Sequence, residues 1–585
     1  MSTRTHTFRV WAPAAEQTVT LCLGDEALPM TRTDDDWWQL DAPAEPGARY
    51  AFRVDDGEER PDPRSLSQPD GPDGRSALVD LGAHQWSDDD WRGVPLADAV
   101  VYELHIGTFT EQGTLDSAIG RLDHLADLGV TLVELMPVAT FPGTRGWGYD
   151  GVDLFAVHEA YGGAAALQRF VDAAHARGLG VCLDVVYNHL GPSNNYLPVF
   201  GPYFTDAHHT PWGWAVNLDG PSSDEVRRYL IDNALMWFRD FHLDALRLDA
   251  VHALIDDRAV HFLEQLAAQT DSLSEVLDRP LLLIAESDRN DPKTVTDRGV
   301  GGTGGLGLHA QWADDVHHTW HVLLTGETQG YYADFADPEA ITKTARTPFF
   351  HDGTWSSFRD REHGRPVDGD TTPGDRFVVS LQTHDQVGNR ATGDRLSHLV
   401  SPGRLAIGAA LMLTSPYTPM LFMGEEWGAS TKWAYFTDHT DSALAQAVSK
   451  GRRAEFAEHG WGDEVPDPQA ASTMTDSVLR WEERDEPVHA ALLAWYRELI
   501  RLRRAVSDLR DPSLTSGRAE RDGDLLTVHR GAHRVVANLG TEPTRVESGL
   551  HIVAAFEASM DAGGGVVVEP DGVVVLGPRS DHERI

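Results

Sequence analysis

Cysteine is almost absent from this chain of 585 residues, which contains two, Cys22 and Cys182. They lie in segments that we expect to belong to different domains, so a disulfide framework is disfavoured and a reducing compartment is favoured. Long apolar runs are also lacking, since Leu405 to Leu413 is about half of the roughly 20 residues that span a bilayer. The first residues show no apolar segment of the signal-peptide type. We therefore expect a cytoplasmic protein with no membrane partner.

Basic residues are outnumbered, with 49 Lys and Arg against 91 Asp and Glu, which gives a formal net charge of −42. Nucleic-acid binding usually draws on clustered Lys and Arg, and no such block appears. The composition therefore predicts no nucleic-acid partner and favours a neutral substrate. Hydrophobic residues make up 41% of the chain, enough to bury a large core, which excludes the disordered and collagen-like classes.

The hydrophobic pattern divides the chain into three regions. Residues 1–90 alternate short β-like runs with Pro, Gly and Asp clusters, which predicts an N-terminal β-sandwich. Residues 91–516 contain eight apolar runs separated by helical stretches and by long aromatic-rich insertions at about 189–223 and 325–375, which predicts a (β/α)8 barrel of the TIM type. The eight runs begin near residues 100, 131, 179, 243, 280, 306, 377 and 417. Residues 517–585 return to short runs such as GVVVEP and GVVVLG and predict a C-terminal β-sandwich.

Polar clusters follow four of the eight apolar runs. They are DVVYNH (184–189), RLDAVH (247–252), AESD (285–288) and THDQVGN (383–389). The carboxyl ends of barrel strands meet at one rim, so we expect the four clusters to converge. One aspartate at a strand end more often caps a helix, but four clusters together favour a catalytic site. Several carboxylates in one rim suit glycoside hydrolysis, which needs a nucleophile and a second, protonated acid.

Metal and cofactor sites are disfavoured. The cluster WADDVHH (312–318) contains adjacent His317 and His318, which point about 100° apart on a helix, and no cysteine accompanies them. GVGGTG (299–304) matches a dinucleotide-binding pattern, but it precedes a strand instead of joining a strand to a helix. We therefore expect no metal and no cofactor.

At the four clusters the sequence resembles the α-amylase clan, glycoside hydrolase family 13, whose motif regions are similar to DVVYNH, RLDA, AES and HD here. The segment Phe8 to Val19 is similar to the family 48 carbohydrate-binding module. The resemblance implies that Asp249 is the nucleophile, Glu286 the acid and base, and Asp385 the carboxylate that fixes sugar hydroxyls. It also implies which residues surround the sugar at subsite −1. Arg247 would orient the nucleophile, and His189 and His384 would hold hydroxyls of the sugar. Tyr149 would be the stacking platform, with Asp150 nearby.

The residues around these motifs look like those of family members that release trehalose. Branching enzymes would show a second Glu where this chain has Ser287. Debranching enzymes would show an AEPW-like sequence there, which this chain does not have. The resemblance implies hydrolysis of the α-1,4 bond beside the terminal trehalose of a maltooligosyltrehalose. Configuration would be retained, with the two carboxyl groups about 5 to 5.5 Å apart. Glucan branching or debranching stays the alternative, whereas a non-catalytic glycan-binding protein is disfavoured because Asp249 and Glu286 are both present.

Selection of trehalose over maltose depends on subsites +1 and +2, where a polar wall discriminates better than apolar area does. Our candidates for these subsites and their surroundings are Trp212, His252, Asp314, Asp315, His317, His318, Gln386 and Asn389. We expect the N-terminal sandwich to brace the barrel more than to bind glucan. The resemblance also implies metabolic coupling to a malto-oligosyltrehalose synthase that makes the substrate.

Overall fold

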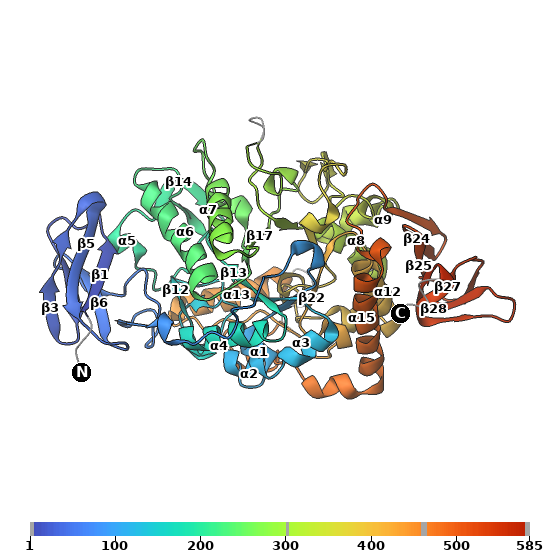
Figure 1. Cartoon of the computed structure of the whole chain (residues 1–585), viewed down its shortest axis with the longest axis horizontal. Helices are drawn as coiled ribbons and strands as arrows, with labels where there is room; N and C mark the ends of the chain where they lie inside the picture. The colour runs from blue at the N-terminus through green and yellow to red at the C-terminus, as the bar shows by residue number, and fades with distance from the viewer. Residues whose placement is uncertain (1–4, 300–303, 458–464, 580–585) are drawn as a thin grey trace.

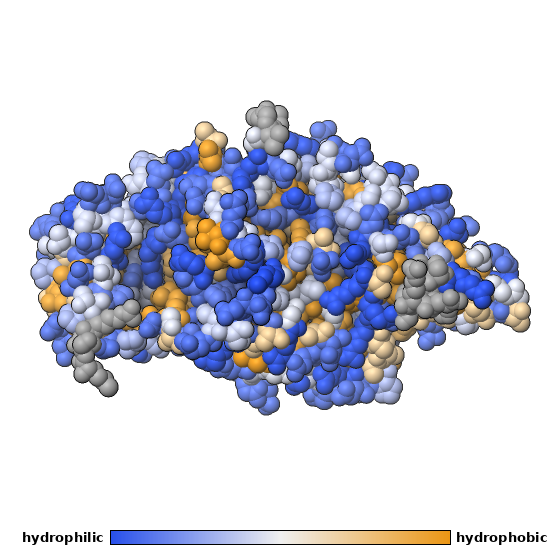
Figure 2. Space-filling view, viewed as in Figure 1, coloured by the Kyte–Doolittle hydropathy of each residue, from blue (hydrophilic) through white to orange (hydrophobic). Residues whose placement is uncertain are grey.

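A computed structural model describes residues 5–299, 304–457 and 465–579. The N-terminal strands lie at one end of the long axis, the barrel in the middle and the C-terminal sheet at the other end (Figure 1). Residues 300–303 of the GVGGTG segment lie outside the described residues. Hydrophilic residues cover most of the face in Figure 2, and hydrophobic residues gather on it only in small groups. Over the described ranges, no helix is both long and apolar enough to cross a membrane.

Two antiparallel sheets form the N-terminal end. The strands of the first sheet are β1 (Thr5–Trp11), β5 (Trp37–Pro43) and β4 (Thr31–Arg32), and those of the second are β3 (Glu26–Pro29), β2 (Val19–Leu23), β6 (Arg49–Val54), β7 (Glu59–Arg60) and β8 (Ser76–Ala77). Phe8 of β1 packs edge-on against Tyr50 of β6, with ring centroids 5.0 Å apart. The two sheets therefore share a core, which confirms the predicted N-terminal sandwich.

Within the described residues, eight parallel strands close into a barrel in chain order. They are β9 (Val101–Leu104), β10 (Leu132–Leu135), β13 (Gly180–Val185), β16 (Ala245–Leu248), β17 (Leu282–Ala285), β18 (Ala310–Trp312), β21 (Phe377–Ser380) and β22 (Thr418–Phe422). Each of the eight apolar runs contains one of these strands, so the predicted barrel is confirmed. Alternate side chains such as Cys182, Ala245 and Ile284 pack inside the barrel.

The longer helices cover the barrel from outside (Figure 1). They include α4 (Gly163–His175), α6 (Ser223–Asp240), α7 (Phe262–Leu277), α8 (Asp314–Thr325), α12 (Pro402–Leu413) and α15 (Pro487–Ala505). Both predicted insertions contain a hairpin: β14 (Phe204–Thr210) with β15 (Gly213–Val216), and β19 (Thr354–Ser356) with β20 (Arg361–His363). Each insertion follows a barrel strand, so it can supply a wall at the carboxyl rim.

The C-terminal strands join into one antiparallel sheet. They are β23 (Arg518–Asp522), β24 (Leu525–Arg530), β25 (His533–Asn538), β26 (Thr544–Val546), β27 (His551–Met560) and β28 (Val566–Gly577). The sequence separates GVVVEP from GVVVLG, but both belong to β28. Asp571 adopts a left-handed φ of 56° between them, and the register with β27 shifts at Phe556. The Asp571 carboxylate accepts from Arg404 of α12 at 2.7 Å, which fastens the sheet to the barrel.

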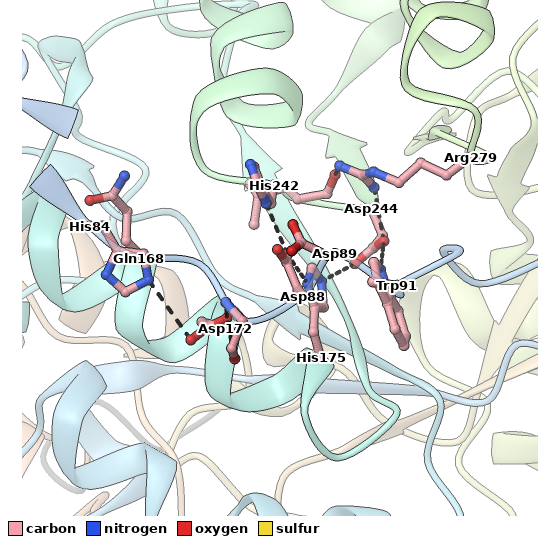
Figure 3. Close-up of polar contacts among 12 residues, drawn as sticks. His84, Asp88, Asp89, Trp91, Gln168, Asp172, His175, His242, Asp244 and Arg279 are labelled. Carbon is pink, nitrogen blue, oxygen red and sulfur yellow. Dashed lines mark hydrogen bonds and ion pairs between the residues drawn. The ribbon is translucent and has the colours of Figure 1, made fainter. Parts of the chain in front are cut away.

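The linker between the sandwich and the barrel is held at the amino ends of β13 and β16 by a buried polar group, which we call the linker cluster (Figure 3). His175 lies between two carboxylates, with Nδ1 2.8 Å from Asp88 and Nε2 3.0 Å from Asp244. Trp91 stacks on the His175 ring and donates to Asp244 at 2.7 Å, and Arg279 donates to the same carboxylate at 3.0 Å. Burial lowers the pKa of His175, but Asp244 and Asp88 outweigh it and the pKa is raised.

Candidate active site

The four polar clusters meet around the guanidinium of Arg247, which is buried at the end of β16. Its Nη1 donates to Asp184 at 2.7 Å and to Asp249 at 2.8 Å, and its Nη2 lies 3.0 Å from Glu286 Oε2. The ring of Trp312 covers the guanidinium group, with its centroid 4.4 Å from the guanidinium carbon. One cation therefore holds carboxylates from β13, β16 and β17 together.

Asp249 and Glu286 have opposite electrostatic environments. Burial opposes ionisation of Asp249, but Arg247, His189 and a 2.7 Å hydrogen bond from Asn188 Nδ2 outweigh it and lower its pKa. Burial raises the pKa of Glu286 to about 8 against the opposing charge of Arg247, with further repulsion from Asp249 and Asp385. At neutral pH the site therefore holds an ionised carboxylate beside a protonated acid.

The backbone after the nucleophile fixes the orientation of the acid. Ala250 has a left-handed φ of 41°, a conformation that costs an L-residue about 1 kcal/mol or more. Its N–H donates to Glu286 Oε2 at 2.6 Å, the same oxygen that contacts Arg247. The hydrogen bond and the ion pair of this carboxyl group both use Oε2, so Oε1 is the oxygen available to carry a proton to a substrate.

Asp385 lies at the open side of the site. It is exposed at the start of a short helix, α10 (His384–Gly388), and its carboxylate raises the pKa of both Glu286 and Asp314. Asn389 Nδ2 donates to Asp385 Oδ1 at 2.6 Å, which fixes the rotamer of the carboxylate. The structure thus brings the three acids predicted as catalytic to one place.

Tyr149 and His384 form one wall of the site. The Tyr149 hydroxyl donates to Asp184 at 2.7 Å and lies 2.8 Å from His384 Nε2, and the two rings are stacked. Asp150 is half-buried, 3.9 Å from His439, and burial raises its pKa.

The first insertion reaches the site through a pair of stacked rings. Trp212 is half-exposed at the turn between β14 and β15, and its ring stacks on His189 at 4.7 Å and 10°. His189 Nδ1 lies 2.6 Å from Asn188 Oδ1, and its Nε2 lies 3.1 Å from the carbonyl oxygen of Tyr149. Trp212 is thereby connected to the residues around the nucleophile.

The cluster 314–318 divides into two faces of α8. Asp314 and His318 are partly exposed and one turn apart, so they lie on the same face. Burial and Asp385 raise the pKa of Asp314 to about 7. Asp315 is buried, and its Oδ2 accepts from Asn290 Nδ2 at 2.9 Å and from the His351 backbone N–H at 2.8 Å.

The remaining predicted residues have protein partners. His317 is buried, with Nδ1 3.0 Å from His318 Nδ1, and burial lowers its pKa well below the usual range. His252 Nδ1 accepts from the backbone N–H of Asp288 at 3.3 Å. Gln386 Oε1 accepts from the hydroxyl of Thr383.

Sequence reasoning assigned no role to several residues of the site. Asp184 and Asn188 stand within DVVYNH and contact Arg247 and Asp249, so that motif was the available signal. Glu103, a lone acid in the apolar run VVYELHIG, contacts His384. Tyr331 in the second insertion packs against His318 at 4.9 Å and is partly exposed.

Side chains able to hold a metal ion meet in one group among the described residues, His208, Asp219 and Asp257. His208 Nε2 already lies 2.9 Å from Asp219 Oδ2. None of the predicted site residues belongs to this group.

An ionised carboxylate paired with a protonated one at the strand ends of a (β/α)8 barrel defines a glycoside hydrolase site. Comparison with known proteins agrees with this class. The family model for the α-amylase catalytic domain matches residues 81–201, and that for carbohydrate-binding module 48, the isoamylase N-terminal domain, matches residues 2–67.

The whole chain is similar to proteins of one kind. It is 52% identical over 575 residues to the malto-oligosyltrehalose trehalohydrolase of Arthrobacter ramosus, covering 97% of this chain and 99% of the relative. The enzyme of the same name from Mycobacterium tuberculosis is 51% identical over 559 residues, covering 94% and 95%. The crystal structure of a putative alpha amylase from Salmonella typhimurium superposes with a TM-score of 0.89 at 38% identity over 98% of each chain. The chain therefore belongs to the malto-oligosyltrehalose trehalohydrolases of the α-amylase family, and the resemblance found in the sequence is confirmed.

Proposed function

We propose that this chain hydrolyses the α-1,4 bond beside the terminal trehalose of a maltooligosyltrehalose and releases trehalose and a maltooligosaccharide. The observation that carries the proposal is the shared contact of Arg247 with an ionised Asp249 and a protonated Glu286. The names of the relatives supply the substrate class.

The reaction needs two steps at one anomeric carbon. Asp249 attacks this carbon while Glu286 delivers its proton from Oε1 to the departing trehalose oxygen, and a glycosyl-enzyme forms. Water then enters, Glu286 takes its proton as a base, and the released chain keeps its configuration. Asp385, on the open side of the pair, holds hydroxyls of the reacting sugar.

The leaving trehalose lies against α8 in this proposal. Asp314 and His318 share the partly exposed face of that helix. The negative charge of Asp385 raises the pKa of Asp314. A wall of polar groups that bind particular hydroxyls rejects a disaccharide whose hydroxyls are placed differently. We assign Asp314 and His318 to the leaving subsites, and we assign Asp315 a supporting role because its Oδ2 is already occupied.

Two further proposals concern the setting of the enzyme. A synthase that forms maltooligosyltrehalose would supply the substrate, so the two activities would be coupled metabolically. Both cysteines are buried and unpaired, which suits a protein that works in the reducing cytoplasm.

The test compares two substrates of equal length. The purified protein is incubated with maltopentaose and separately with maltotriosyltrehalose, and trehalose, glucose and maltooligosaccharides are quantified. We expect rapid trehalose release from the second substrate and little attack on the first. Equal attack on both, or chain transfer without trehalose, would contradict the proposal and favour another α-amylase-family activity.

A further inference from the structure

Two glutamates lie side by side in the barrel interior, and the mechanism above uses neither. Glu103 of β9 and Glu134 of β10 are partners in the parallel ladder, and each is 1% exposed. Glu103 Oε1 lies 2.5 Å from Nδ1 of His384, and Oε2 accepts the His384 backbone N–H at 2.8 Å. Neither carboxyl oxygen of Glu134 has a hydrogen-bond partner in the described part of the chain.

His384 connects Glu103 to the groups around the nucleophile. Its Nε2 lies 2.8 Å from the Tyr149 hydroxyl, which in turn lies 2.7 Å from Asp184 Oδ2. Arg247 Nη1 donates to the same Asp184 oxygen at 2.7 Å. A continuous series of polar contacts therefore runs from Glu103 to the guanidinium that holds both reacting carboxyl groups.

The number of protons available decides which group donates and which accepts in each of these hydrogen bonds. A tyrosine hydroxyl has one proton to donate, and an ionised carboxylate only accepts. Burial raises the pKa of Asp184 to about 6, so Asp184 is ionised above that pH and accepts the hydrogen bond that the Tyr149 hydroxyl donates. Nε2 of His384 must then donate to Tyr149, while Nδ1 must donate to Glu103. With an ionised Glu103, both contacts are satisfied together only when His384 carries two protons.

We propose that Glu103 is a positioning residue that keeps His384 doubly protonated, so that Tyr149 donates to Asp184 and the Asp184–Arg247 contact beside the nucleophile is fixed. The inference rests on the proposed function, because the group that it positions is the hydrolytic site.

Other charged and titratable groups also act on the His384 ring. They are Asp385 beside it, Arg247 from β16, Glu134 from β10, Asp184 from β13 and His105 after β9. Burial lowers the pKa of the ring, but Glu103 outweighs it and the pKa is raised to about 9. Within the described residues, Glu103 is the group that contacts Nδ1.

The adjacent glutamate provides a matched control. Burial and the neighbouring Glu103 raise the pKa of Glu134 to about 8, so Glu134 is protonated at neutral pH. Glu134→Gln therefore leaves the charge unchanged at neutral pH, whereas Glu103→Gln replaces the carboxyl group that contacts Nδ1 of His384.

The first readout is the pH profile of kcat/KM on any α-1,4-linked substrate that the wild-type protein cleaves. With the ring pKa at about 9, about nine tenths of His384 is protonated at pH 8. Without Glu103, burial holds the ring pKa below the ordinary value of about 6.5, so at most about 3% of the rings are protonated at pH 8. We therefore expect Glu103→Gln to lower kcat/KM by at least about thirtyfold at pH 8 and by a smaller factor at pH 6. Glu134→Gln should stay within about twofold at pH 6, where Glu134 is protonated. A uniform loss at every pH in Glu103→Gln, or the same profile in both variants, would overturn the proposal.

The second readout does not depend on activity. Protein labelled with ¹⁵N-histidine is titrated by NMR, and the His384 signals are assigned by their loss in His384→Asn. The proposal expects two protonated ring nitrogens in the wild type at pH 7.5, and a neutral ring in Glu103→Gln. A neutral His384 in the wild type at that pH would overturn it. A wild-type protein that cleaves neither maltopentaose nor maltotriosyltrehalose would instead contradict the proposed function, and the NMR result would still decide the protonation of His384.

Discussion

The backbone N–H of Ala250 donates to Oε2 of Glu286 at 2.6 Å, which joins the loops that follow β16 and β17. A loop that carries the nucleophile thereby sets which oxygen of the acid is free. The left-handed backbone of Ala250 is the local strain that makes this contact possible.

Replacing the two reacting carboxyl groups should have separable effects. Glu286→Gln removes the proton donor, so we expect kcat on maltooligosyltrehalose to fall by about 10²- to 10⁴-fold. A substrate with a fluoride leaving group needs no protonation, so formation of the glycosyl-enzyme from it should survive in Glu286→Gln and fail in Asp249→Asn. Mass spectrometry of the trapped intermediate measures this difference. Full hydrolytic activity in either variant would show that the residue has been assigned wrongly.

The activity of the wild type should decline on the alkaline side near the pKa of Glu286. The acid donates only while it is protonated, and its pKa is raised to about 8 by burial and by Asp249 and Asp385. We therefore expect kcat/KM to be maintained below pH 8 and to fall tenfold for each unit above it. The acidic decline should begin near pH 6, because burial raises the pKa of Asp184 to about 6 and its protonation weakens the contact with Arg247. An alkaline decline with its midpoint near pH 5 instead of pH 8 would contradict the assignment of Glu286 as the proton donor.

Two neighbouring aspartates of α8 should respond differently to the same substitution. Asp314→Asn should raise KM for maltotriosyltrehalose with little change in melting temperature, because the side chain is partly exposed beside Asp385. Asp315→Asn should lower the free energy of unfolding by about 1–3 kcal/mol, because a buried acceptor of two hydrogen bonds is replaced. Thermal unfolding and steady-state kinetics on both variants decide the matter. An unchanged KM in Asp314→Asn would remove that residue from the leaving subsites.

The ring stack of the first insertion should contribute to substrate binding. Trp212→Ala should raise KM about two- to tenfold, the range expected from the loss of an aromatic stacking contact. Trp214, on the same hairpin, is 61% exposed and has no ring contact in the described residues, so Trp214→Ala is the control. Equal KM values for the two variants would mean that the stack on His189 does not position the substrate.

The linker cluster should contribute stability that depends on pH. The pKa of His175 is raised in the folded state, so its contribution is complete below the ordinary value of about 6.5 and is lost as the pH rises through the folded-state value. The pKa of Asp88 is lowered, so its contribution is present above about 4 and is lost on acidification. His175→Asn should therefore cost about 3 kcal/mol near pH 5.5 and less near pH 9, as measured by denaturant unfolding. A cost that did not change between these pH values would contradict an ion pair at His175.

The barrel could be predicted because each strand is a nearly continuous apolar run and because four runs end in polar clusters. The C-terminal sheet was harder, since Pro570 to Gly572 has the composition of a turn and β28 instead passes through it with Asp571 in a left-handed conformation. A local signal of this kind is overridden when the segments on both sides of it pair with one neighbouring strand, here β27.

The reacting acids could be placed from the sequence because they follow strand ends, but their neighbours could not. Asp314 and Asp315 are adjacent in the chain, and only the rotation of α8 relative to the barrel decides which one faces the open side. Glu103 gave no motif, because its partner His384 lies 281 residues further along the chain.

The linker cluster also limits how this protein can be divided. Asp88 and Trp91 come from the linker, yet they contact His175 and Asp244, which belong to the barrel. A chimera that exchanged the carbohydrate-binding module at residue 90 would remove Asp88 and leave His175 without one of its two carboxylates. A junction placed before His84 keeps the entire cluster with the barrel, so a chimera joined there should be more stable than one joined at residue 90.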